Sequence, residues 1–60
     1  PAMKAHLHID NAAFADALVI RGWGKADAQL AALHVSPAEA RSLVADLPSM
    51  TDEDLEDLFD

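Results

Sequence analysis

The residues of this chain that could carry out chemistry are mostly carboxylates, accompanied by a few histidines. Eleven acidic residues and three histidines stand against four basic residues, and cysteine is absent. His6, His8 and Asp10 alternate near the start, and on a strand they would share one face, as metal ligands can. Asp10 is better explained as a helix cap, because its carboxylate can accept the free amides of a first turn. We therefore expect no metal site, and a short, solvated, extended arm over residues 5–9.

Nucleophilic catalysis and cofactor binding find equally little support in the sequence. Ser36 and Ser49 have no accompanying pattern of histidine and carboxylate, and the chain has no glycine-rich phosphate loop. A chain of 60 residues buries only about 60% of the surface it exposes when unfolded, which leaves little room for a substrate cleft. The sequence therefore predicts a noncatalytic protein without a cofactor.

Composition sets further bounds on the class of protein. The formal charge is −7 and 52% of the residues are apolar, yet no apolar run approaches the roughly 20 residues that span a bilayer. Residues 1–3 are interpreted as a cloning remnant and residues 4–60 as one small helical domain. We expect a cytoplasmic protein that does not enter a membrane.

Helix-capping residues divide the domain into short segments. Ser36, Pro37 and Glu39 form the strongest local pattern, a capping box with proline at the first helical position. Gly22 is placed to end the first helix, and Thr51 to begin the last one. The predicted fold is all-α, a small bundle of three to four short helices at about 11–21, 26–34, 37–47 and 52–59.

Such short helices are marginally stable alone in water, so they must pack against one another or against a partner. The expected core consists of the large apolar residues at helical spacing, namely Ile9, Phe14, Leu18, Leu30, Leu33, Val35, Leu43, Val44, Leu47, Leu55 and Leu58. Thirteen of the apolar residues are alanine, and the large side chains are few for a stable core. We therefore expect a homodimer, or a core that a partner completes.

Negative charge is concentrated in the last helix. Residues 1–48 hold five acids and four bases, which sum to −1, whereas residues 49–60 hold six acids and no base, which sum to −6. Two interpretations of Leu55, Leu58 and Phe59 stay open. Either these side chains pack on the body of the domain with the acids in solvent, or they bind a basic groove on another protein.

Trp23 lies between Gly22 and Gly24 and also admits two interpretations. The permissive loop could present the indole outward, where it would bind a partner. Alternatively, the indole folds back over the small core and shields it from water. Trp23 is therefore a candidate partner-binding residue with a structural alternative.

Residues 24–47 resemble the helix-turn-helix of bacterial regulators, with 37–47 as the candidate recognition helix. That helix offers only Arg41 to phosphates, opposed by Glu39 and Asp46, although such contacts dominate binding to duplex DNA. Nucleic acid is therefore not the favoured partner. A small regulator, either a DNA-binding helix-turn-helix protein or an acidic inhibitor that mimics nucleic acid, is the alternative function.

The segment 47–59 is similar to the short acidic helices at subunit ends of modular polyketide and nonribosomal peptide synthases. This resemblance to their docking domains implies a noncatalytic helical module that joins consecutive subunits. It implies that Leu55, Leu58 and Phe59 contact the partner. The surrounding acids that would set partner choice are Asp54, Glu56 and Asp57. The leading prediction is thus a protein–protein docking or adaptor module, whose partner is a protein or subunit with a basic and apolar groove.

Overall fold

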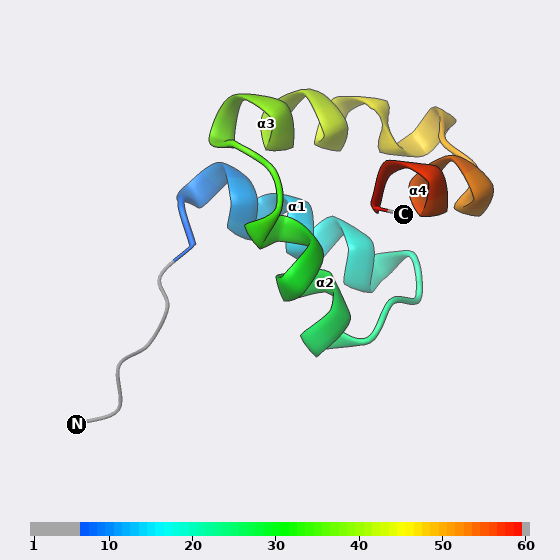
Figure 1. Ribbon diagram of the computed structural model, residues 1–60, viewed down its shortest axis with the longest axis horizontal. Coiled ribbons are helices and arrows are strands. Elements are labelled where there is room, and N and C mark those ends of the chain that lie inside the picture. The colour runs from blue at the N-terminus through cyan, green and yellow to red at the C-terminus, as the bar shows by residue number, and fades with distance from the viewer. Residues whose placement is uncertain (1–6, 60) are drawn as a thin grey trace.

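The computed structural model describes residues 7–59, and from Ile9 onward these consist of helices and their connecting turns. Their order is α1 (Ile9–Ile20), α2 (Lys25–Leu33), α3 (Pro37–Asp46), the 3-10 turn η1 (Leu47–Ser49) and α4 (Asp52–Phe59). The prediction of an all-α bundle of short helices is confirmed (Figure 1). The predicted cloning remnant, part of the predicted arm, and His6 lie outside the described residues.

The helix α1 is central to the arrangement. It packs against both α2 and α3, and η1 continues α3 toward α4. Figure 1 shows α4 beyond the end of α3, turned back so that its C-terminal turn points toward the middle of the molecule. This turn brings Phe59 beside Phe14 of α1 and beside Trp23 of the α1–α2 loop. The last helix therefore contacts parts of the chain that are distant in sequence.

The start of α1 differs from the prediction. His8 is the N-cap, and its Nδ1 accepts a hydrogen bond from the amide of Asp10 at 3.2 Å. Asp10 thus lies in the first turn instead of capping it, and Ile9, which was expected in the extended arm, is already helical. Ile9 is 78% exposed. Phe14 is five positions further along the helix, so the two side chains lie about 140° apart around it. Phe14 is buried and Ile9 is not, so the prediction that Ile9 belongs to the core is wrong.

The end of α1 confirms the role predicted for Gly22. Its φ is +111°, in the region that glycine adopts without a steric penalty. The amide of Gly22 donates to the carbonyl of Val19 at 2.9 Å, and the amide of Trp23 donates to that of Leu18 at 3.1 Å. These two bonds form a Schellman motif, which ends the helix and starts the loop toward α2.

Reciprocal capping bonds begin both α3 and α4. The predicted capping box is confirmed, since Glu39 and Ser36 exchange amide-to-side-chain bonds of 3.2 Å. Thr51 caps α4 as predicted, because its Oγ1 accepts from the amide of Asp54 at 3.1 Å. In return the amide of Thr51 donates to the Asp54 carboxylate at 3.0 Å. The carboxylate of Asp54, a predicted partner contact, therefore serves the fold.

The core is built as much from alanine as from large side chains. Its buried residues are Phe14, Ala15, Leu18, Ala28, Ala31, Ala32, Ala40, Leu47 and Leu55. The contribution of α2 consists of Ala28, Ala31 and Ala32. The prediction that Leu30 and Leu33 are buried is wrong, since each is 57% exposed. Small side chains allow α2 to lie close against α1, and this orientation turns the leucines outward.

The remaining large residues of the predicted core divide into three groups. Phe14, Leu18, Leu47 and Leu55 are buried as predicted. Val35, Leu43 and Val44 are half-buried and pack against the core. Ile9 and Leu58, which the prediction also placed inside, are largely at the surface. The buried volume is thus smaller than the sequence suggested, because alanines occupy positions assigned to larger residues.

Asn11 is the buried polar residue of the described core, with an exposed fraction of 5%. Its Nδ2 donates to the carbonyl of Ala32 at 2.9 Å and to the carbonyl of Val35 at 2.8 Å. Carbonyls at the end of a helix have no partner within the helix. One side chain of α1 therefore satisfies one carbonyl in the last turn of α2 and one carbonyl of the α2–α3 turn, and it fixes that turn against α1.

Candidate functional site

Arg21, at the C-cap of α1, connects the body of the domain to α4. Its Nη1 donates to the carbonyls of Leu47 and Met50, both at 2.8 Å. Its Nη2 donates to the Asp52 carboxylate at 3.0 Å. The Arg21 side chain is only 24% exposed, so these charge-assisted bonds are partly shielded from water. Sequence reasoning missed this role, because the contacts join residues about 30 positions apart.

We expect Arg21→Gln to loosen α4 and to lower the free energy of unfolding by about 1–3 kcal/mol, since hydrogen bonds to charged groups are lost. Amide hydrogen exchange measured by NMR should accelerate in α4 relative to the parent chain, and it should accelerate more in α4 than in α1. Arg41→Gln is the matched control, because Arg41 makes one exposed bond, of 3.1 Å, to the Asp10 carboxylate. If the amides of α4 exchange at the same rate in Arg21→Gln and Arg41→Gln, Arg21 does not hold α4 against the body of the domain.

Three aromatic rings connect α4 to the loop after α1. The ring of Phe59 lies 6.2 Å from that of Phe14 and 6.1 Å from that of Trp23, centre to centre. The Trp23–Phe59 pair meets edge to face, with an interplanar angle of 71°, an arrangement that aromatic pairs prefer. Trp23 is half-buried and packs against the core. The geometry thus favours the interpretation of Trp23 as a cover, with part of its indole still at the surface.

The three apolar residues of α4 lie in different environments. Leu55 is fully buried, so its side chain is part of the core and cannot contact a partner while α4 stays packed. Phe59 is half-buried and packs edge to face with Trp23. Leu58 is 42% exposed and is the residue of this set most available to a partner. Glu56 and Asp57, predicted to set partner choice, are both exposed.

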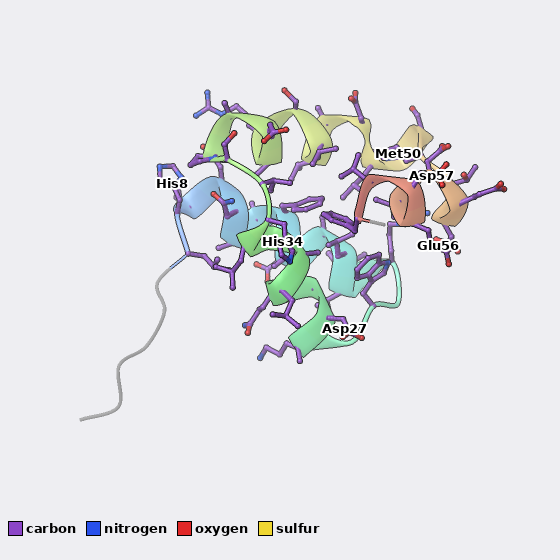
Figure 2. All side chains as sticks on the ribbon, in the orientation of Figure 1. His8, Asp27, His34, Met50, Glu56 and Asp57 are labelled. Carbon is purple, nitrogen blue, oxygen red and sulfur yellow. The ribbon has the colours of Figure 1, made fainter. Side chains whose placement is uncertain are left out.

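A cleft separates α2 from α4 and has a volume of about 560 Å³. It is lined by Gly22, Trp23, Gly24, Asp27, Leu30, Ala31, His34, Glu56 and Phe59. Figure 2 labels its polar side chains, with Asp27 on α2, His34 directly after the end of α2, and Glu56 on α4. Apolar and aromatic side chains form the cleft together with carboxylates from two helices. We call it the α2–α4 cleft.

A second hollow lies on the other side of the end of α4. This α3–α4 groove has a volume of about 360 Å³ and is lined by Ala38, Glu39, Ser42, Leu43 and Leu58. Leu58 and Phe59 are consecutive, and each lines one of the two hollows. The C-terminal turn of α4 therefore lies between them. We call the cleft, the groove and this turn together the α4-end face.

Most of the α4-end face was absent from the sequence prediction. Of the predicted partner contacts, the structure brings Trp23, Glu56 and Phe59 together in the cleft and places Leu58 in the adjoining groove. Leu30 and Asp27 of α2 join them without having been predicted as site residues. The alternation of alanine and leucine along α2 was the available signal, because either set can form a helical stripe.

The sequence raised two other kinds of site, a nucleic-acid interface and a metal site that includes His6, which lies outside the described residues. Arg41 is the basic residue of the candidate recognition helix α3, and its guanidinium is already bound to Asp10. Within the described part of the chain, no group of three or more histidine, cysteine or acidic side chains could hold a metal ion. Over the same residues, none of the helices has the length and apolar character needed to cross a membrane.

Comparison of the chain with protein-family models, with curated proteins and with solved structures found no match. The fold and the α4-end face define a small all-α domain with an uneven surface, apolar beside its hollows and acidic around α4. Function is therefore inferred from these residues alone.

Proposed function

We propose that this chain is a noncatalytic docking module that binds another protein through the α4-end face. The orientation of α2 is the observation that supports this proposal best. Its alanines face α1, while Leu30 and Leu33 are each 57% exposed. A helix of a small domain normally buries its leucines. Leucines that face outward beside an aromatic-lined cleft indicate a surface that a partner covers.

The energetics of such an interface follow from its two kinds of side chain. Leu30, Leu33 and Leu58 are each about half exposed, so covering each one would contribute roughly 1 kcal/mol. The exposed carboxylates of α4 would accelerate encounter with a basic partner and disfavour acidic ones. The similarity of segment 47–59 to the acidic ends of polyketide and nonribosomal peptide synthase subunits suggests one setting, the joining of consecutive subunits. The cytoplasmic location and a homodimer stay predictions.

Substitution of the exposed leucines tests the proposal. We expect Leu30→Ser and Leu58→Ser each to raise the dissociation constant for the physiological partner about tenfold or more. A tenfold rise corresponds to a loss of about 1.4 kcal/mol of binding free energy. The partner is identified by crosslinking in cells of the source organism and then expressed, and affinities are measured by isothermal titration calorimetry. Circular dichroism checks that each variant keeps its helices.

The matched control is Ile9→Ser, since Ile9 is 78% exposed and lies at the far end of α1 from the Arg21 contacts. This variant should bind like the parent chain. If all three variants bind the partner equally well, the α4-end face is not the docking surface. A partner that proves to be DNA, with an affinity that falls steeply with salt, would replace the docking proposal by the regulator.

A further inference from the structure

The floor of the α2–α4 cleft is aromatic. Trp23 and Phe59 both line it and meet edge to face at 6.1 Å. Neither ring is fully buried, so part of their surface is available to a bound group. The face of an indole attracts a cation that lies within about 6 Å of its centre, because the ring carries negative charge on its faces. The floor is therefore suited to an arginine or lysine side chain as well as to an apolar one.

Carboxylates from two helices line the same cleft. Asp27 comes from α2 and Glu56 from α4, and both are exposed. Neither forms an ion pair with any other residue that the structure describes, whereas Arg21 and Arg41 are each bound to an aspartate. His34 completes the polar lining. The cleft thus combines an aromatic floor with negative charge that the neighbouring residues leave unneutralised.

On the basis of the proposed docking function, we infer that the α2–α4 cleft receives an arginine or lysine side chain of a basic amphipathic helix in the partner. The cation lies over Trp23, between Asp27 and Glu56. The apolar side of the same helix covers Leu30 and Leu33, which are exposed along α2. Charge complementarity therefore sets which partner binds, and the leucines supply most of the affinity.

A second copy of this chain fits the cleft less well than a basic helix does. Two copies facing each other would bring together two domains of formal charge −7. Six of the acids of each chain lie in residues 49–60, and Glu56 of this segment lines the cleft. Such repulsion opposes association. A basic helix instead neutralises the same carboxylates.

Trp23 is the single tryptophan of the chain, so its fluorescence reports directly on the cleft. The probe is a synthetic amphipathic peptide of about 14 residues, roughly four helical turns, made of leucine, alanine and arginine. A second peptide carries citrulline, a neutral isostere, in place of arginine. We expect the arginine peptide to change Trp23 emission in a saturable way, and the citrulline peptide to bind at least about fivefold more weakly.

Charge-matched variants locate the binding site. Glu56→Gln and Asp27→Asn should each weaken binding of the arginine peptide about two- to fivefold, in line with the modest strength of exposed charge pairs. Glu53→Gln is the control for Glu56, because it removes the same charge from α4 at an exposed residue that does not line the cleft. Asp16→Asn on α1 is the control for Asp27. Both controls should bind the peptide nearly as the parent chain does.

Three results would overturn the inference. Equal weakening by Glu53→Gln and Glu56→Gln would mean that the peptide senses only overall charge. If the two peptides bind equally well, or if Trp23 emission does not change up to about 1 mM peptide, the cleft does not bind a cationic side chain. Sedimentation that shows a dimer with Trp23 shielded would make the second copy the occupant. Each of these leaves the docking proposal standing if Leu30→Ser and Leu58→Ser each still weaken binding of the physiological partner about tenfold or more.

Discussion

Leu55→Ala is expected to lower the free energy of unfolding by about 2–5 kcal/mol, as replacement of a buried leucine by alanine does. Leu55 is fully buried, and it is the one residue of α4 in the buried core. A domain of 60 residues has a total stability of only about 3–9 kcal/mol. The variant should therefore lose α4 from the body of the domain or unfold entirely.

The matched substitution is Leu58→Ala, three residues further along the same helix. Leu58 is 42% exposed, so its truncation should cost less than about 1 kcal/mol. Under the proposed docking function, the same change removes an apolar contact with the partner. Urea denaturation and partner affinity, measured on both variants, separate a core residue from a binding residue. If Leu55→Ala keeps the stability of the parent chain and loses only partner binding, then Leu55 contacts the partner, as the resemblance to docking domains implies.

The helix boundaries were predictable because the signals that set them are local. Ser36, Gly22 and Thr51 each act on amides or carbonyls within a few residues, and all three end or begin a helix where the sequence placed them. The start of α1 was not predictable in the same way. Both His8 and Asp10 can accept a hydrogen bond from a free amide, and the choice between them depends on backbone geometry.

The burial of individual residues was harder to predict, because it depends on contacts between distant segments. Along α2 the alanines and the leucines each form a stripe, and periodicity alone favours burying the larger residues. The structure buries Ala28, Ala31 and Ala32 instead. This arrangement lets Ala32 of α2 and Val35 of the α2–α3 turn approach Asn11 of α1, whose side chain donates to both of their carbonyls. A polar contact of this kind leaves no periodic signal in the sequence.

In the candidate site, too, the features set by neighbouring residues were predictable, and those set by the packing of distant segments were not. The amphipathic character of α4 and its acidic surface followed from the sequence, and α4 spans the predicted residues 52–59. Which of its apolar residues face solvent depends on how α4 packs. Arg21 binds the start of α4 across about 30 residues of sequence, and the cleft forms from α2 and α4 together. No local pattern could place Asp27 and Glu56 in the lining of the same cleft.

Asn11→Asp is expected to destabilise the domain by more than about 3 kcal/mol at neutral pH. The Nδ2 group that donates to the carbonyls of Ala32 and Val35 at 2.9 and 2.8 Å would be replaced by a carboxylate oxygen. Two hydrogen bonds are lost, and a buried negative charge faces two carbonyl oxygens. Because α2 and the α2–α3 turn are fixed by this contact, the variant should be largely unfolded at neutral pH, as far-ultraviolet circular dichroism would show.

The pH dependence of this effect identifies its cause. A buried carboxyl without a cationic partner is accommodated in its protonated, neutral form, which can also donate one hydrogen bond. Folding then favours the protonated variant, so its stability relative to the parent chain is greatest at low pH and falls as pH rises and the carboxyl ionises. Asn11→Ala loses the same two bonds without adding a charge, and its difference from the parent should be the same at about pH 4 and about pH 7. Equal pH dependence of the Asp and Ala variants would show that the residue at this position does not face the two carbonyls in solution.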